Sequence, residues 1–238
     1  MIPELRDILF LDIETVAITE NYQQLNERMK TQWSRKASFL RREEGQTDEF
    51  LFDQRAGIYS EFGKIICIGI GMLFDHESGG VGLKTKAYYG DDERSLLFEF
   101  KSVLEKLDSA TLKLCAHNGR EFDFPYLCRR MLVNDIPLPA VLNLSGRKAW
   151  EIPHLDTMEM WKFGDYKHYT SLDLLATIFN IPSSKNDIEG SQVNSVYYKE
   201  RDLIKIKDYC ERDVVVLSQI FLKMKGYPLI PSQNIISA

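Results

Sequence analysis

The stretch Ile8-Leu9-Phe10-Leu11-Asp12-Ile13-Glu14 decides the fold and the chemistry that we expect from this chain of 238 residues. Its apolar run of strand formers predicts a buried strand over residues 8–11. Asp12 and Glu14 follow at once, and the alternation of side chains along a strand turns both carboxylates to one face. At about 5 Å and an effective dielectric constant near 20, two such charges repel by about 3 kcal/mol. Solvent, a basic neighbour, a shared proton or a metal must offset this repulsion, unless the strand simply runs out into an acidic turn.

The rest of the chain alternates between strand and helix patterns. We predict strands over residues 64–74, 83–89, 112–116 and 152–158, and helices over residues 91–107, 124–133, 171–179 and 203–224. The turn-rich residues 75–82 join the second and third strands as a hairpin. The last helix has the clearest pattern, with apolar residues at steps of three and four until Gly226 and Pro228 end it. This order predicts an α/β fold, a mixed sheet flanked by helices, formed by residues 1–238 as a single domain.

Residues 19–60 separate the first two strands by far more than the few residues of an ordinary hairpin connection. Their apolar residues are spaced as a helical stripe, which predicts a helical insertion. Residues 28–42 contain six basic side chains and no acid. We hypothesise that this basic face guides a nucleic-acid backbone, with Trp33 or Phe39 available to stack on bases. The alternative is a solvated helix whose aromatic side chains belong to a core.

Two further groups of residues are candidates for chemistry. Asp123 falls at a connection from a strand to a helix, where ligand sites gather in open α/β sheets, although it could simply cap the helix. Asn118 either positions substrate or stabilises an Asn-Gly turn. Tyr209 and Asp213 are four residues apart and share one face of the last helix. The alternative there is a tyrosine at the core margin beside a solvated aspartate.

Taken together, Asp12, Glu14, Asp123 and Asp213 supply four carboxylates from three separate elements, and Tyr209 adds a phenol. Oxygen donors of this kind suit hard divalent cations such as Mg²⁺ or Mn²⁺. Two ions about 3.5–4 Å apart are able to clamp the attacking and leaving oxygens of a phosphodiester.

The three motifs resemble those of DEDD-type 3′–5′ exonucleases with a tyrosine in the third motif (the DEDDy subgroup), in particular the proofreading exonuclease domain of family B DNA polymerases. The resemblance is carried by residues 10–15, by Asn118 with residues 122–126, and by residues 209–213. Residues 64–70 also resemble the second strand of that domain. The resemblance implies a ribonuclease-H-like fold.

The same resemblance implies roles for individual residues. Two divalent metal ions would be held by Asp12, Glu14, Asp123 and Asp213. Tyr209 would orient the attacking water or help to deprotonate it, and a free phenol with a pKa near 10 favours the orienting role. Thr15, Asn118 and Phe122 are the candidates for substrate binding.

Two polar residues near the motifs could support the site or only the fold. Asp156 could be an acid behind the metal ligands, but we favour a structural role. His117 precedes the second motif, and a satisfied structural histidine is again the favoured interpretation.

Composition narrows the class of protein. The net charge of −5 excludes a generally basic, sticky protein, but it leaves nucleic-acid binding open. The longest nearly pure apolar run, residues 65–74, is too short to span a bilayer, which needs about 20 residues. We expect no signal peptide, no membrane partner, and free thiols in a reducing cytoplasm, because the four cysteines form no C-x-x-C pair.

We therefore expect a cytoplasmic, stand-alone 3′–5′ exonuclease that releases nucleoside 5′-monophosphates from single-stranded ends. The preference for DNA over RNA rests on the resemblance only. The alternatives are an exoribonuclease with the same chemistry, a non-catalytic nucleic-acid-binding module of a repair complex, and a structure-specific endonuclease.

Overall fold

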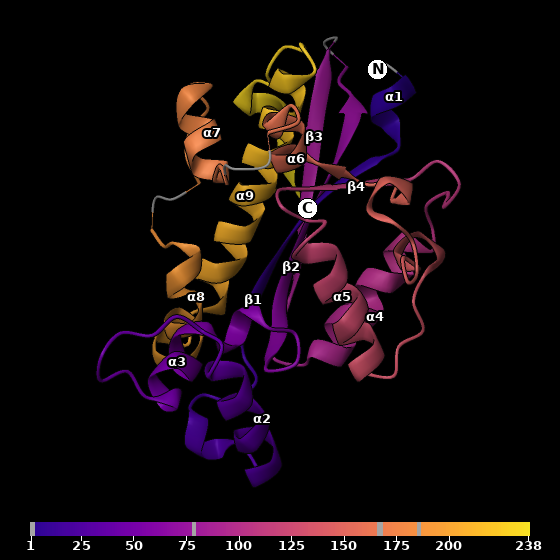
Figure 1. The fold of residues 1–238 in the computed structure, drawn as a ribbon. Coiled ribbons are helices and arrows are strands. Elements are labelled where there is room, and N and C mark those ends of the chain that lie inside the picture. Colours follow the sequence, from indigo (N-terminus) through magenta and orange to yellow (C-terminus); the bar gives the residue numbers. More distant parts are fainter. Residues whose placement is uncertain (1–2, 78–79, 166–168, 185–186) are drawn as a thin grey trace.

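The computed structural model describes residues 3–77, 80–165, 169–184 and 187–238 (Figure 1). Over these residues, six strands form one mixed sheet in the order β5-β4-β1-β2-β3-β6. Their bounds are β1 Ile8–Ala17, β2 Gly63–Asp75, β3 Val81–Tyr89, β4 Lys113–Ala116, β5 Leu155–Asp156 and β6 Ile235–Ser237. The pairs β1–β2 and β2–β3 are antiparallel, whereas β4 pairs in parallel with β1 and β5, and β6 with β3.

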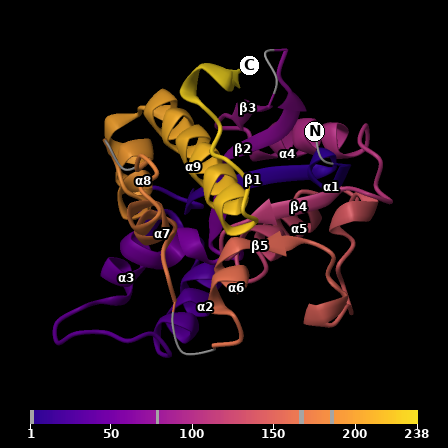
Figure 2. The same cartoon turned by 90° about the horizontal axis from the view of Figure 1, so that it is seen from above.

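Helices cover both faces of the sheet (Figures 1 and 2). The main ones are α9 (Leu203–Met224) on one face, and α4 (Glu93–Leu104) and α5 (Asp123–Val133) on the other. The remaining α-helices are α1 Pro3–Arg6, α2 Glu27–Ala37, α3 Asp48–Arg55, α6 Thr157–Lys162, α7 Leu172–Ile178 and α8 Val193–Ser195. The predicted α/β class with a mixed sheet is thus confirmed.

Alternation along β1 decides which layer receives each side chain. Leu9 and Leu11 belong to the core formed with α4 and α5. Phe10 points to the other face and packs edge-on against Phe221 of α9, with ring centroids 5.4 Å apart. Asp12 and Glu14 share the parity of Phe10, so both carboxylates lie on the α9 face.

Two predicted strands differ from the structure. The first strand is longer than residues 8–11, so that Asp12 and Glu14 lie within β1 rather than after it. The strand predicted over residues 152–158 is correct only at Leu155 and Asp156, because residues 152–154 precede β5 and Asp156 ends β5 and caps α6. Its Oδ1 accepts hydrogen bonds from the backbone amides of Met158 and Glu159.

The insertion folds around a small core of its own. Helices α2 and α3 enclose Trp33, which is fully buried, contacts Phe52 and Phe62 edge-on, and donates from its indole nitrogen to the Asp48 carbonyl. The hypothesis that Trp33 stacks on bases is therefore wrong, because the ring is an internal packing element. Phe39 is 88% exposed.

A buried ion pair joins the end of the insertion to the main core. Arg130 of α5 makes two hydrogen bonds to the Glu93 carboxylate of α4, and it also donates to the Ser60 carbonyl. Glu93 Oε1 in addition accepts from the Ile65 amide of β2. One ion pair therefore holds α4, α5, β2 and the insertion together.

None of the helices in the described ranges is both long enough and apolar enough to cross a lipid bilayer.

We expect Arg130→Met to lower the free energy of unfolding by about 3–5 kcal/mol, because Glu93 would be left buried and charged without its partner. Arg6→Met is the matched control. It breaks an exposed pair with Asp75 and should cost at most about 1 kcal/mol. Urea unfolding of both variants checks the difference, and equal losses would contradict this account of the Arg130 pair.

Candidate active site

The acids of β1 lie where the strand loses one of its neighbours. β4 pairs with β1 only as far as Phe10 opposite Cys115, whereas the pairing with β2 continues, with Asp12 opposite Gly69. A side chain at Gly69 would come within 2.9 Å of the Cys210 sulfur. This glycine therefore lets α9 approach the strand closely at the level of Asp12.

Asp123 occupies the side of β1 that β4 leaves open. It is the first residue of α5, and its carboxylate accepts a hydrogen bond from the backbone amide of Ile13, between the two acids of β1. The loop before it is held by Asp156, whose carboxylate accepts from the amides of Asn118 and Arg120. Asp156 thus has the structural role that we expected.

Asn118 has the left-handed backbone conformation, with φ at +61°, which supports its role in the turn. Its side-chain oxygen is buried and, within the described residues, has no hydrogen-bond partner. Its predicted role in substrate binding stays a prediction.

The third motif comes from α9. Tyr209 and Asp213 are both buried, and the tyrosine hydroxyl donates a hydrogen bond to the Asp213 carboxylate. Burial first, and then the carboxylates of Asp213, Glu14 and Asp12, raise the pKa of Tyr209 far above its ordinary value. The phenol is therefore held in its neutral, hydrogen-bond-donating form.

Electrostatic coupling shows that the three elements converge. Burial raises the pKa of Asp12 well above its ordinary value, and the neighbouring charges of Asp213 and Asp123 raise it further. Burial, followed by the charge of Asp12, also raises the pKa of Glu14 well above its ordinary value. The pKa of Asp123 rises to about 7, mainly through burial, with contributions from Asp156 and Asp213. Acids more than a hundred residues apart in the chain thus share one charged site.

The site opens into a cleft of about 540 Å³. The predicted residues that line it are Asp12, Glu14, Thr15, Phe122, Tyr209 and Asp213. Of the other described residues with predicted roles, Asp123 and Asn118 lie beside the cleft rather than in its lining. The insertion also lines it, with residues 53–55 of α3 and residues 57–58 of the following turn.

Cys210 is a member of the site to which the sequence analysis gave no role, although it lies within the third motif, residues 209–213. Its Sγ lies 3.6 Å from Asp12 Oδ2, and one ligand atom each from Asp12, Glu14 and Cys210 lie within 4.8 Å of one another. The thiol hydrogen bond favours the ionised form of Asp12 and partly opposes the effect of burial on its pKa. The only available signal was the position of Cys210 next to Tyr209.

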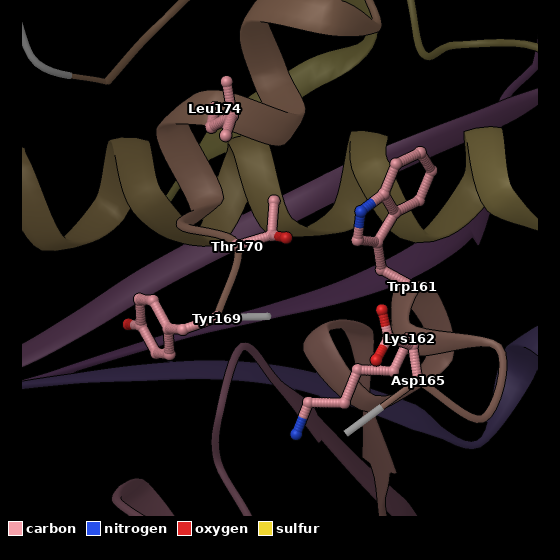
Figure 3. Close-up of a pocket in the computed structure, with 6 residues that line it drawn as sticks. All are labelled: Trp161, Lys162, Asp165, Tyr169, Thr170 and Leu174. Atoms are coloured by element: carbon pink, nitrogen blue, oxygen red, sulfur yellow. The ribbon is translucent and has the colours of Figure 1, made fainter. Parts of the chain in front are cut away.

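A second pocket of about 370 Å³ adjoins the cleft, because Tyr169 lines both (Figure 3). Tyr169 and Trp161 lie on opposite sides of this pocket, with Thr170 between them. His117 Nε2 makes a hydrogen bond to the Thr170 carbonyl, and His117 Nδ1 makes a hydrogen bond with the Thr157 hydroxyl. His117 is therefore a satisfied structural histidine, as expected.

Comparison with known proteins assigns the family. A family model described as a predicted 3′–5′ exonuclease related to the exonuclease domain of PolB matches residues 59–228. The chain belongs to this family. The match includes the second and third motifs, whereas the first motif and most of the insertion precede it. Membership in this PolB-related exonuclease family implies a nucleic-acid substrate.

Comparison with a solved structure shows which fold this PolB-related chain has. The family B DNA polymerase from the hyperthermophilic archaeon Pyrobaculum calidifontis superposes with a TM-score of 0.57 at 13% identity, over 91% of this chain and 24% of the polymerase. The chain thus spans about a quarter of the polymerase's length. At this identity the likeness shows the fold, and the expected ribonuclease-H-like architecture is confirmed. No curated protein sequence matches the chain.

The donor set fits a divalent cation. Three of the four clustered carboxylates, those of Asp12, Glu14 and Asp123, have raised pKa values, so the cluster ionises fully only when positive charge arrives. Carboxylate oxygens are the donors that Mg²⁺ and Mn²⁺ prefer. The mutual repulsion of the acids is thus the property that a bound cation would relieve.

We expect Asp12→Asn to raise the melting temperature of the metal-free protein, because one of the repelling charges is removed. The same change should abolish the stabilisation that Mn²⁺ confers on the wild-type protein. Asp208→Asn, on the exposed face of α9, is the control and should keep the full Mn²⁺ response. Thermal unfolding with and without Mn²⁺ measures both effects.

The Mn²⁺ response should also grow with pH. Burial and the Asp213 charge raise the pKa of Asp12, so the metal-free site retains protons that a cation must displace. We expect a larger increase in melting temperature at about pH 8 than at about pH 6. An increase that is constant over this range would contradict metal binding at these acids.

Proposed function

We propose that this protein is a metal-dependent 3′–5′ exonuclease that hydrolyses phosphodiester bonds at single-stranded DNA ends and releases nucleoside 5′-monophosphates. The observation that carries the proposal is the convergence of acids from β1, α5 and α9 beside one cleft, together with the neutral tyrosine of α9. The family match to predicted exonucleases supports the reaction class.

In this proposal Asp12, Glu14, Asp123 and Asp213 hold two divalent ions, Mg²⁺ or Mn²⁺. When bound, such ions stabilise the charge that develops on the attacking and leaving oxygens. Asp123 is kept in place by the Ile13 amide, and Asp213 by the Tyr209 hydroxyl. Each donor therefore approaches the cleft from a fixed direction.

Tyr209 has a positioning role toward water in this proposal. Its raised pKa keeps the hydroxyl protonated, so the phenol orients the attacking water as a hydrogen-bonding partner and does not act as the base. Phe122 lines the cleft and is half-buried, which leaves one part of the ring available to the terminal base. Thr15 places a hydroxyl beside the same acids.

The size of the cleft supports action on chain ends. About 540 Å³ is the size of a small-ligand pocket, with room for nucleotides at the end of one strand but not for an intact duplex. The preference for DNA rests on the relation to a polymerase domain. The proposal also includes a cytoplasmic location, which the free state of all four cysteines supports.

Degradation of labelled oligonucleotides tests the function. Single-stranded DNA and RNA of one sequence, each labelled at the 5′ end, are incubated with Mg²⁺ or Mn²⁺ and then with a chelator. We expect DNA to give a ladder that shortens from the 3′ end, and chelator to stop it. Faster shortening of RNA than of DNA would favour the exoribonuclease. Cleavage of a circular single strand, tested in parallel, would favour the endonuclease. Binding without any shortening would favour the non-catalytic module.

Variants of the site test the assignment of roles. Asp12→Ala should lower the rate of cleavage by about 10³-fold or more. Tyr209→Phe should slow cleavage by about 10- to 100-fold and leave the Mn²⁺-induced thermal shift intact, because the phenol holds no metal in this scheme. Asp208→Asn should cleave at the wild-type rate. Full activity in Asp12→Ala would overturn the site.

A further inference from the structure

The insertion forms one wall of the catalytic cleft. The last residues of α3 and the turn that follows it, residues 53–58, reach the rim of the cleft beside α8. Figure 1 shows α3 next to α8 at this end of β1, and the side chain of Asn194 in α8 donates to the Asp53 carbonyl. A segment that the family match does not include is therefore part of the candidate active site.

Hydrogen bonds fix this wall relative to the acids. The Tyr126 hydroxyl donates to the Gly57 carbonyl at 2.8 Å, and Asn194 also accepts from the Ala17 amide of β1 at 2.9 Å. A side chain at Gly57 would lie only 3.1 Å from the backbone of Val16, so the turn touches the strand that carries Asp12. The wall is thus positioned by the same elements that position the acids.

The charges on the cleft lining are unbalanced. Its acids are Asp12, Glu14, Asp53 and Asp213, and among the described lining residues Arg55 is the single cation. Arg55 is exposed at the end of α3, and within the described ranges it makes no hydrogen bond or ion pair. A guanidinium with no protein partner beside acids is available to a phosphate.

The basic side chains of residues 28–42 lie elsewhere. None of them is among the described residues of the cleft lining, and several are already engaged within the insertion. Arg42 pairs with Asp48, Lys30 pairs with Glu27, and Lys36 lies over the ring of Tyr59. The backbone-guiding role that we first attributed to this stretch fits Arg55 better.

We propose that Arg55 binds a backbone phosphate of the substrate strand next to the scissile phosphate, and so makes the insertion a substrate-holding wall. This inference rests on the proposed exonuclease function. Guanidinium forms paired hydrogen bonds to phosphate oxygens, which a lysine cannot reproduce with the same geometry. Ile58, 51% exposed on the same wall, offers an apolar contact to the adjoining sugar or base.

Binding measurements in a cleavage-deficient background test the contact without depending on turnover. Fluorescence anisotropy of a single-stranded DNA oligonucleotide is measured with Asp12→Ala protein in Mn²⁺ over a series of NaCl concentrations. Adding Arg55→Ala should weaken binding by about tenfold and reduce the slope of log K against log salt by about 0.7. Arg55→Lys should keep the slope but recover only part of the affinity.

Arg129→Ala is the matched control. Arg129 is exposed on α5 and is not among the described residues that line the cleft, and its replacement removes the same charge. We expect its affinity and salt slope to equal those of the Asp12→Ala parent. If Arg55→Ala and Arg129→Ala have the same slope and affinity, the proposed contact is refuted.

Replacing single phosphates of the oligonucleotide by uncharged methylphosphonates identifies the phosphate that Arg55 contacts. Oligonucleotides with one methylphosphonate at the first or second linkage on the 5′ side of the scissile bond are compared in the two backgrounds. At the contacted linkage, neutralisation should weaken binding to the parent but not to Arg55→Ala. Equal losses in both proteins at both linkages would overturn the assignment.

A failure of the proposed exonuclease function and a failure of the Arg55 contact give different results. If the wild-type protein does not shorten DNA or RNA from the 3′ end, the proposed function fails. If it does so and Arg55→Ala binds and cleaves like Arg129→Ala, only the role of Arg55 fails.

Discussion

The repulsion among buried carboxylates is the constraint on which this structure depends. Burial and mutual charge raise the pKa values of Asp12, Glu14 and Asp123 together, so the fold assembles the site against an electrostatic cost. The protein offsets part of that cost locally, with the Ile13 amide on Asp123 and the Cys210 thiol on Asp12. The rest must come from the packing of α9 on β1 and β2, which explains why a glycine stands opposite Asp12.

Helix α5 serves both the acids and the insertion. Asp123, Tyr126 and Arg130 recur at steps of three and four, which places them along one side of the helix. Asp123 accepts a hydrogen bond from the Ile13 amide of β1, and the Tyr126 hydroxyl donates to the Gly57 carbonyl. Arg130 donates to the Ser60 carbonyl and also pairs with Glu93. A single rigid element therefore determines the distance between the clustered acids and the wall of the cleft.

Local patterns in the sequence predicted most of the site, because strand alternation and helical spacing are short-range rules. These patterns predicted that Asp12 and Glu14 share one face of a strand and that Tyr209 lies beside Asp213 on one face of a helix. They also predicted the full extent of the last helix, residues 203–224. They did not give contacts that depend on packing between distant segments. Cys210 looked like any apolar stripe residue, and Trp33 looked available until the aromatic core of the insertion enclosed it. The short strand β6 was missed because three residues carry little pattern.

The boundary of the family match separates two parts of the site. Residues 59–228 include Asp123, Tyr209 and Asp213, and also Tyr126 and Asn194, which bond the insertion. The preceding residues supply Asp12 and Glu14, but also Arg55 and its wall. Tyr126 and Asn194 hold that wall through the backbone carbonyls of Gly57 and Asp53, so its side chains are able to differ without disturbing these hydrogen bonds. The proposed phosphate contact therefore lies in the insertion, whereas the clustered acids lie on the sheet and on α5 and α9.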